Sequence, residues 1–499
     1  MISCFLLIAK CISRLILIVL LMPTTHFLMS DKIFCQTITF QKIFGSPLHE
    51  YGSSIRECAD RGYIITGYTN NTENLDPDVY LIKTNEFGDT LWTKRYGGSN
   101  WDEGTSVVQS YDGGYVVSGL TQSFGNGFPD IFLFSTDSLG VINWFKTYGG
   151  LKDDRAFDMQ QTNDSGYIVV GRTYSFGQGD DDIYLLRMDK NGDTVWTRVI
   201  NITSPAVGYA VLQTKDYGFM ISGSVDNGSS DIILIKTDNL GNITWTRIYG
   251  GINHEDSFDV KETNDSGFVV IGQTLSFGAG ASDVYLIKTN YSGDTLWTRT
   301  FGERGIDIGY SIDITNNNGF IITGGTQDTM GNIDIYLIKT NSSGDSLWTS
   351  KFDNGINDQG KSVIQTSDGG FALLGWTLTD PFPGHINIFL IKTNENGLIT
   401  SLDDTIIKYT TPYHFDILQN YPNPFNPSTV IRYQLSVASQ VKLSIFNLLG
   451  QEIATLVDEH KPQGSYGVEW NAEKFSSGIY FYRLTAGNFV KTKKLVLLK

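Results

Sequence analysis

The stretch GDTLWTRTFG, residues 293–302, decides the fold because the chain repeats it. Close copies are GDTLWTKRYG (88–97), GDTVWTRVI (192–200) and GDSLWTSKF (344–352), and looser copies are GVINWFKTYG (140–149) and GNITWTRIYG (241–250). The repeated tryptophans follow one another at steps of 52, 52, 49, 52 and 51 residues, at Trp92, Trp144, Trp196, Trp245, Trp297 and Trp348. Such a constant period is typical of repeat architectures, in which each unit needs its neighbours.

The repeat extends beyond these six copies. Counting back 52 residues from Trp92 leads to Phe40, an aromatic residue in the same frame, and the phrase ends after Trp348. The array therefore holds seven units over residues 37–402. The strand-like segment 37–45 precedes the first complete unit, whereas the last unit lacks a tryptophan strand of its own. We expect the first strand to complete the last unit, which offsets the entropy of closing so long a loop.

Each unit contains four short strand-like runs. In one of them, TSVVQS (105–110) and YVVSGLT (115–121) flank the turn YDGG, and DIFLFSTD (130–137) precedes the tryptophan strand. Asp-Gly and Gly-Gly steps favour tight hairpins, and Val, Ile, Tyr and Thr favour strands. No segment has helical periodicity. Four-stranded units of about 50 residues predict an all-β fold, a seven-bladed β-propeller.

The blades are expected to be apolar on both faces, since neither parity of the run 79–82 (VYLI) is polar. Such a sheet has to pack between two neighbours, and a closed ring provides them for every blade. We therefore interpret the six repeated tryptophans as structural residues that fill the space between blades, each with its indole N–H bonded to a backbone carbonyl.

The units resemble two known classes of propeller. They are similar to kelch and galactose-oxidase-type repeats in period and in the glycine that ends the second strand, at Gly67, Gly119, Gly171, Gly223, Gly272, Gly324 and Gly375. They differ in having a single glycine there, except at 324–325. The phrase KTNYSGDTLWT (288–298) also resembles the tryptophan-docking motif of quinoprotein propellers, which would imply a quinone cofactor. Those enzymes carry a vicinal disulfide, which Cys58 alone cannot form.

Candidate ligand-binding residues lie on the innermost strands, since propellers bind at the mouth of their central channel. One register of these strands holds an amide or carboxylate in six units: Glu57, Gln109, Gln161, Gln213, Glu262 and Gln365. A second register holds Ser54, Ser106, Asp158, Ala210, Asp259, Ser311 and Ser362. We expect one register to face the channel. The alternative is that these amides only bond to neighbouring strands.

Two further sets of carboxylates recur. The loops that enter the inner strands carry acids, at Asp102, Glu103, Asp153, Asp154, Glu255, Asp256, Asp353 and Asp358. No loop has the spacing of a known calcium motif, so we expect solvated surface charge. The alternative is that these clustered carboxylates chelate Ca²⁺, which binds six to eight oxygens. Another acid precedes the third strand, at Asp78, Asp130, Asp182, Asp231, Asp283 and Asp334, and is expected to bond turn amides.

Composition excludes some functions. A net charge of −16 argues against binding to nucleic acid, because phosphate backbones are bound by clustered Lys and Arg. The chain has no HExxH, GxSxG or Walker motif, and its histidines are scattered. Residues 1–36 read as a signal peptide, with Lys10 and Arg14 before the apolar run 15–22 (LILIVLLM). The alternative is a retained membrane anchor.

Composition changes after residue 402. Residues 403–417 are expected to be a linker, and residues 418–499 contain strand-like runs at 441–448, 452–458, 465–471, 478–486 and 489–498. Their spacing predicts a small immunoglobulin-like β-sandwich with Trp470 in its core. The prolines of 420–429 (NYPNPFNPST) are unsuited to a central strand and mark a rigid entry.

This C-terminal region resembles the type A sorting domain of type IX secretion substrates of Bacteroidota. The matching motifs are NYPNPFNPST (420–429), IFNLLGQEIATLVDE (445–459), SSGIYFYRL (476–484) and KTKKLVLLK (491–499). The resemblance implies recognition by the outer-membrane translocon and removal by its sorting protease. It also implies release or attachment at the cell surface of a Gram-negative bacterium.

The sequence thus favours a secreted or surface-attached protein whose monomeric propeller binds an extracellular glycan or protein, without a cofactor. One alternative is an enzyme that acts on polysaccharide or an alcohol at the channel mouth, and another is a structural spacer without a ligand. The uniform units argue against an enzyme, which would need one irregular blade with unique groups aimed inward.

Overall fold

The computed structural model describes residues 37–399, apart from 47, 71–75, 179, 203 and 379–384. It also describes residues 416–498, apart from 418–419, 421–422, 436–437, 462–463 and 488. The expected signal peptide and most of the expected linker lie outside the described residues. Within the described residues, no helix has the length and apolar character needed to span a membrane.

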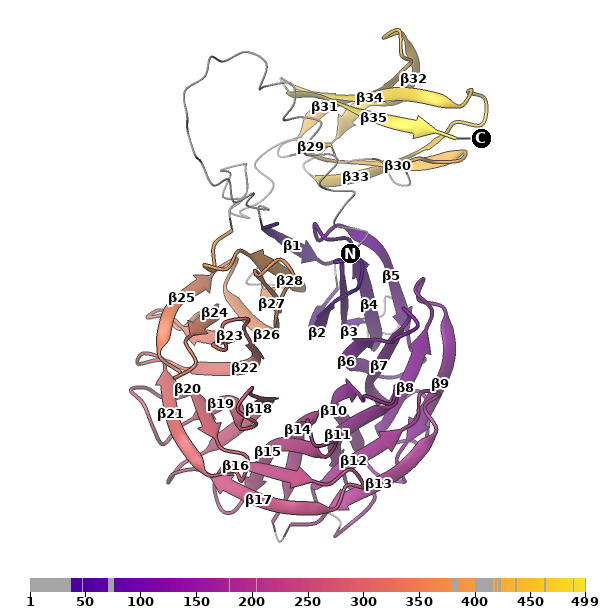
Figure 1. Cartoon of the computed structure of the whole chain (residues 1–499). Helices are drawn as coiled ribbons and strands as arrows, with labels where there is room; N and C mark the ends of the chain where they lie inside the picture. Colours follow the sequence, from indigo (N-terminus) through magenta and orange to yellow (C-terminus); the bar gives the residue numbers. More distant parts are fainter. Residues whose placement is uncertain are drawn as a thin grey trace, which may run out of the picture. The chain divides into compact units, whose positions relative to one another are not determined.

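Seven four-stranded antiparallel blades stand around a central channel, which confirms the predicted seven-bladed β-propeller (Figure 1). The innermost strands are β2 (Glu50–Glu57), β6 (Asp102–Gln109), β10 (Asp154–Gln161), β14 (Ala206–Gln213), β18 (Glu255–Glu262), β22 (Asp307–Ile314) and β26 (Asn357–Gln365). The second strands are β3 (Tyr63–Asn70), β7 (Tyr115–Thr121), β11 (Tyr167–Thr173), β15 (Phe219–Asp226), β19 (Phe268–Thr274), β23 (Phe320–Gln327) and β27 (Phe371–Leu378).

The third and fourth strands complete each blade. The third strands are β4 (Pro77–Thr84), β8 (Asp130–Thr136), β12 (Asp182–Met188), β16 (Ser230–Thr237), β20 (Asp283–Thr289), β24 (Ile333–Thr340) and β28 (Ile386–Thr393). The outermost strands are β5 (Thr90–Tyr96), β9 (Ile142–Tyr148), β13 (Thr194–Ile200), β17 (Ile243–Tyr249), β21 (Thr295–Phe301), β25 (Ser346–Phe352) and, in the last blade, β1 (Phe40–Phe44).

The ring closes as the sequence predicted. Strand β1 pairs antiparallel with β28, so the N-terminal strand completes the last blade. Phe40 stands opposite Lys392, just as Trp348 stands opposite Lys339 in the preceding blade. Phe40 is therefore the seventh member of the tryptophan series.

Apolar layers between neighbouring blades form the core of the propeller. The second and third strands are buried on both faces, as in β8, where all seven residues are buried. Each hydrophobic cluster combines side chains of two blades; one of them joins Leu133 of β8 to Val169 of β11. A single blade would expose both apolar faces to water, so the ring is needed to bury them.

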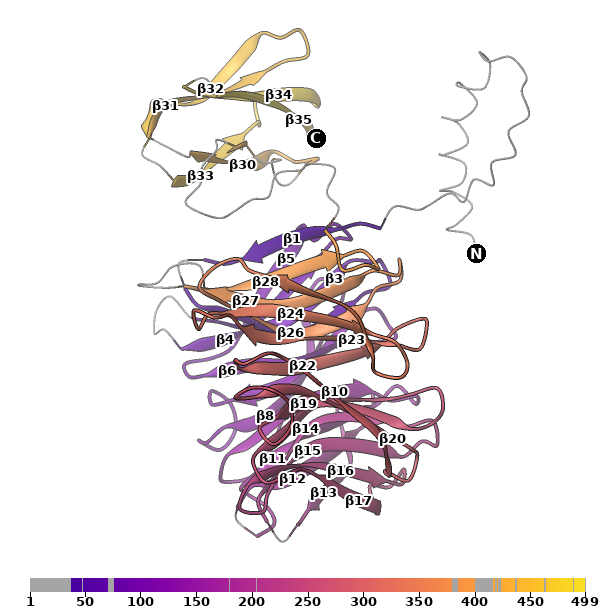
Figure 2. The same cartoon turned by 90° about the vertical axis from the view of Figure 1, so that its left-hand side faces the viewer.

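The C-terminal region forms two facing sheets (Figures 1 and 2). One contains β29 (Asp416–Ile417), β30 (Ser428–Leu435) and β33 (Gly464–Asn471), and the other contains β32 (Glu452–Lys461), β31 (Ser439–Phe446), β34 (Gly478–Ala486) and β35 (Phe489–Leu497). Trp470 is buried between them, as predicted. Strand β29 shows that sheet pairing begins before residue 418, and an immunoglobulin-like strand order stays a prediction.

Candidate ligand-binding site

Every inner strand carries a β-bulge at the same level of the channel. The register shifts around one extra residue in each blade, as between Gly52 and Ser54 in β2. A bulge bends its strand and redirects the extra side chain. The seven extra residues all line the channel: Ser53, Thr105, Phe157, Tyr209, Phe258, Tyr310 and Lys361. We call them the bulge ring, and they line both channel cavities described below.

The first cavity, which we call the entry cavity, lies where the inner strands begin and has a volume of about 560 Å³. Besides the bulge ring, its wall contains Tyr51, Gly52, Tyr68, Trp101, Glu103, Gln359 and Trp376. The ring of Tyr51 stacks on Tyr68 with centroids 4.8 Å apart and lies 5.8 Å from the ring of Trp376. One side of this cavity is therefore a continuous aromatic surface.

The bulge ring is asymmetric. Blades three to six contribute an arc of aromatic side chains, with centroid distances of 5.3 Å from Phe157 to Tyr209, 5.9 Å from Tyr209 to Phe258 and 4.9 Å from Phe258 to Tyr310. The Lys361 ammonium ends the arc, 3.6 Å from the centroid of the Tyr310 ring. The first two blades place only the small side chains of Ser53 and Thr105 opposite the arc. The repeat thus becomes irregular inside the channel.

Two charged groups in the entry cavity have shifted protonation equilibria. Burial raises the pKa of Glu103 to about 7 and lowers the pKa of Lys361 to about 8. Gln359 donates a hydrogen bond from Nε2 to the Tyr310 hydroxyl oxygen at 3.2 Å. The cavity therefore offers aromatic faces together with a few polar groups, as ligand sites commonly do.

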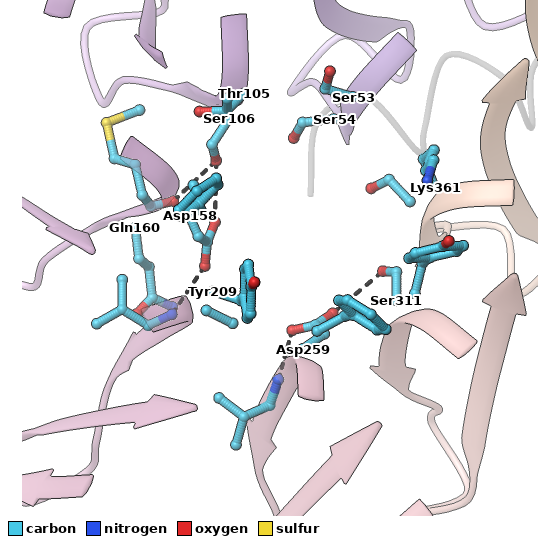
Figure 3. A pocket seen from close by; sticks show the side chains of 18 of the residues that line it. Ser53, Ser54, Thr105, Ser106, Asp158, Gln160, Tyr209, Asp259, Ser311 and Lys361 are labelled. Carbon is cyan, nitrogen blue, oxygen red and sulfur yellow. Dashed lines mark hydrogen bonds between the residues drawn. The ribbon is translucent and has the colours of Figure 1, made fainter. Parts of the chain in front are cut away.

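The second cavity, which we call the inner cavity, lies on the other side of the bulge ring and has a volume of about 480 Å³ (Figure 3). All seven residues of the predicted Ser/Asp register line it. Asp158 accepts hydrogen bonds from Ser106 Oγ at 3.2 Å and from the Val211 amide at 3.1 Å, on the two neighbouring blades. Asp259 accepts from Lys261 Nζ at 2.6 Å and from the Ile312 amide of the next blade at 3.0 Å. Both carboxylates already bridge blades, so ligand binding by them stays a prediction.

The Gln/Glu register lines neither of the two channel cavities, so ligand binding by its members stays a prediction. Its members end the inner strands, far from the entering loops. Five of them accept a hydrogen bond from a backbone amide of the adjacent blade, at Ala59 to Gln109, Asn163 to Gln213, Lys215 to Glu262, Asn316 to Gln365 and Ser367 to Glu57. Gln161 holds the same strand position in β10. This geometry favours the structural alternative.

The repeated tryptophans pack against the next blade. Trp92 lies 5.9 Å from Tyr115 and Trp297 lies 6.3 Å from Phe320, between ring centroids. The turn glycine of that blade closes the contact: Gly344 has φ +78°, and a Cβ on it would come within 2.5 Å of Trp297. Only glycine fits a turn that needs both this conformation and this approach.

The expected hydrogen bond from the indole N–H is wrong at Trp245, whose Nε1 is buried without a partner among the described residues. A tyrosine four residues further along the outer strand bonds the turn carbonyl instead. Tyr96 donates its hydroxyl proton to Gly140 O at 2.6 Å, and Tyr249 donates likewise to Gly293 O. Each tyrosine lies on the same face of the outer strand as the tryptophan four residues earlier, and its hydroxyl reaches the turn carbonyl of the next blade.

Some acids of the entering loops are buried, although we expected them to be exposed to solvent. The acid that begins an inner strand is buried, with exposures of 2% for Asp102 and 0% for Asp154, Glu255 and Asp358. Each accepts a hydrogen bond from a loop amide four residues earlier, as Asp154 does from Gly150 N at 2.7 Å. A carboxylate that organises its own loop needs no solvent. The acid before the third strand bonds turn amides as predicted, for example Asp130 with Asn126 N at 2.7 Å.

Residue-by-residue reading missed the aromatic wall of the entry cavity. Of the nine tryptophans, six belong to the repeat and Trp470 to the sandwich, so Trp101 and Trp376 remain, and both line this cavity. Because Trp101 and Trp376 lie outside the 52-residue series, their positions could have indicated this cavity from the sequence. The bulge ring was harder to find, because its residues face the channel only through an inserted residue that sequence spacing does not reveal.

Comparison with known protein families matches residues 419–498 to the secretion system C-terminal sorting domain. The chain is a type IX secretion substrate. Its tail indicates export to the cell surface or secretion in Bacteroidota and implies interaction with the secretion machinery. No curated protein matches the sequence.

Solved structures similar to the chain include PorZ, a surface component of the type IX secretion system of Porphyromonas gingivalis, at 10% identity and a TM-score of 0.35 over 88% of this chain and 69% of that chain. The propeller domain of the Trilobed protease from Pyrococcus furiosus matches at 11% identity and a TM-score of 0.39, over 72% and 98%. An α-L-arabinanase from Penicillium chrysogenum matches at 8% and 0.33, over 72% and 97%. Similarity at this level says nothing about function.

Proposed function

We propose that the propeller is an extracellular glycan-binding module whose ligand enters the entry cavity. The observation that carries this proposal is the aromatic wall formed by Tyr51, Tyr68, Trp101 and Trp376 above the aromatic arc of the bulge ring. Sugar rings have apolar C–H faces and hydroxyl edges. Aromatic side chains pack against the faces, and sparse polar groups fix the orientation.

The polar groups of the entry cavity suit hydroxyl edges. Glu103, Gln359 and Lys361 supply acceptors and donors in the cavity wall, and Ser53 and Thr105 add hydroxyls. A cavity of about 560 Å³ accommodates one or two sugar residues of a longer chain. The net charge of −16 makes neutral or cationic glycans better ligands than polyanionic ones.

Binding is favoured over hydrolysis by the set of acids in this cavity. Most glycosidases use two carboxyl groups that flank the scissile bond. Among the described residues that line the entry cavity, Glu103 is the only carboxylic acid. A pKa of about 7 would suit a general acid, but no second carboxylate faces it across the cavity.

Glycan-array binding by the purified propeller-containing chain tests the proposal. We expect selective binding that Trp101→Ala and Trp376→Ala each weaken at least 10-fold, since buried tryptophans are frequent hot spots. Tyr111→Ala is the matched control, because Tyr111 is a highly exposed aromatic outside the cavity. Absence of binding to any glycan, equal binding by all variants, or turnover of a bound glycan that Glu103→Gln abolishes would each overturn the proposal.

We further propose that the sorting protease removes residues 418–499 and that the propeller then acts as a monomer, either released or attached to the surface. The sorting-domain match at 419–498 supports this. Intact-mass analysis of the exported protein tests it, because retention of the C-terminal motif KTKKLVLLK would contradict removal.

A further inference from the structure

Three carboxylates converge where the sixth blade meets the seventh. Asp334 lies near the start of β24, Asp353 follows β25, and Asp358 lies near the start of β26. One carboxylate oxygen of each lies within 4.8 Å of the other two. Asp358 is fully buried, Asp334 is half-buried and Asp353 is exposed, so the group is open to solvent on one side.

Asp358, like Asp102, Asp154 and Asp307 at the equivalent positions of other junctions, has one buried carboxylate oxygen without a hydrogen-bond donor among the described residues. In Asp358 this oxygen is Oδ1, whereas Oδ2 accepts a hydrogen bond from the Asn354 amide at 2.7 Å. A buried, unsatisfied carboxylate oxygen is costly, and coordination to a cation is one way to satisfy it.

The other blade junctions show that Asp353 is an addition. Five residues before the start of the acidic inner strands, the equivalent positions hold Gly45, Gly97, Gly149, Gly250 and Gly302. Asn201 stands there before Ala206. At Gly149 a Cβ would lie 2.0 Å from Asp130 Oδ1 and 2.8 Å from Asp154 Oδ2. At the junctions with glycine this position leaves no room for a side chain, whereas here it carries a third negative charge beside two others.

We propose that Asp334, Asp353 and Asp358 bind one Ca²⁺ ion that links the sixth blade to the seventh. Hard oxygen ligands select Ca²⁺ or Mg²⁺, and three carboxylates supply three to six of the six to eight oxygens that Ca²⁺ takes, with water on the open side. Mg²⁺ needs stricter octahedral geometry and is expected to bind more weakly. The seventh blade is the one that β1 closes, so the ion would reinforce the ring at its seam.

The charges nearby agree with this assignment. Burial, together with Asp353 and Asp334, raises the pKa of Asp358 to about 6. Lys351 lies close enough to lower the pKa of Asp334 against the effect of burial, but it is one cation facing three carboxylates. Ionisation of all three therefore leaves excess negative charge for a divalent ion to neutralise.

Calorimetric titration and thermal unfolding of the full chain, stripped of divalent ions, test the site with CaCl₂ and MgCl₂ as probes. We expect one Ca²⁺ per chain at this site, with a Kd on the order of 10⁻⁴–10⁻³ M as in other extracellular modules, and weaker binding of Mg²⁺. At 100 times the Kd, Ca²⁺ should lower the unfolding equilibrium constant about 100-fold.

Asp353→Gly is the decisive variant, because glycine is the residue at five of the other junctions. It should lose at least 10-fold in Ca²⁺ affinity, yet be at least as stable as the natural chain in EDTA, since one repulsive charge is gone. Glu303→Ala, which removes an exposed acid from the neighbouring junction, should bind Ca²⁺ normally. No Ca²⁺ binding by the natural chain, or equal binding after Asp353→Gly, would overturn the assignment.

Discussion

The ring of Phe40 packs edge-on against the ring of Tyr63, with centroids 6.1 Å apart and planes at 68°. Phe40 belongs to the strand that completes the last blade, and Tyr63 begins the second strand of the first blade. This contact occupies the place that Trp92, Trp196, Trp245, Trp297 and Trp348 each hold against the aromatic residue of the next blade. The propeller is therefore closed by the same packing that joins its internal blades.

Phe40→Ala is expected to destabilise the protein by about 2–3 kcal/mol, near the lower end for loss of a core phenylalanine, because Phe40 is only half-buried. Denaturant unfolding of the full chain measures the loss. Gln41→Ala, on the same strand but exposed, should change stability by less than about 0.5 kcal/mol. Equal effects of the two variants would show that the seam is not held by this aromatic contact.

A second prediction concerns the buried lysine or arginine that stands opposite the outer-strand aromatic residue in six blades; opposite Trp144 the residue is Ser135. In five blades this lysine or arginine pairs with an aspartate of the inner hairpin turn, as Lys392 pairs with Asp368 at 3.0 Å. In the sixth blade the turn residue is Asn317, and burial lowers the pKa of Lys339 to about 8. Asn317→Asp would restore the charge pair.

The sign of the pH dependence follows from that lowered pKa. A lysine in the unfolded chain keeps its proton up to about pH 10.4, so between about pH 8 and 10.4 the unfolded state binds more protons and stability rises with pH. Asn317→Asp should flatten this rise and add about 1–2 kcal/mol at pH 7. Asn316→Asp adds the same charge one residue away and is the control; an equal gain there would contradict the pairing.

The raised pKa of Glu103 predicts that, at lower pH, stability changes in the opposite direction. Its folded pKa of about 7 lies above the value of about 4.3 in an unfolded chain. The folded state therefore binds more protons between these values, and stability falls as pH rises from about 4 to 7. Glu103→Gln should remove this fall and stabilise the protein by about 1–2 kcal/mol at pH 8. Urea unfolding at pH 5 and pH 8 measures it, with exposed Glu395→Gln as the control.

Gln109→Ala separates a structural role of the Gln/Glu register from a binding role. Its Oε1 accepts the hydrogen bond of the Ala59 amide at 2.9 Å across two blades. The variant should lose about 1 kcal/mol of stability, as expected for one hydrogen bond, and bind glycan as well as the natural chain. Reduced glycan affinity at unchanged stability would show that this register is part of the ligand site.

The repeat made the fold predictable. Tryptophans at a constant spacing, hairpin turns and strands apolar on both faces left a closed ring of blades as the consistent solution, and the position of Phe40 predicted its seam. The same regularity gave no indication of the entry cavity. It drew attention to positions shared by all blades, such as Gln109 and Gln213, whereas shared positions in a repeat mainly serve contacts between repeats.

The entry cavity could not be predicted from spacing alone. Phe157, Tyr209, Phe258 and Tyr310 are the inserted bulge residues of their strands and therefore line the channel. The alternation of side chains along an ideal strand does not reveal such an insertion. Trp101 and Trp376 are about 275 residues apart in sequence and share a wall only because the ring brings the seventh blade next to the first.

By itself the sequence determined the export route and the number and order of the blades, because both are written in local motifs and in their period. Only the tertiary structure decided which side chains meet inside the channel and where three aspartates converge. Those encounters depend on ring closure and on single-residue bulges, which act between residues far apart in the chain.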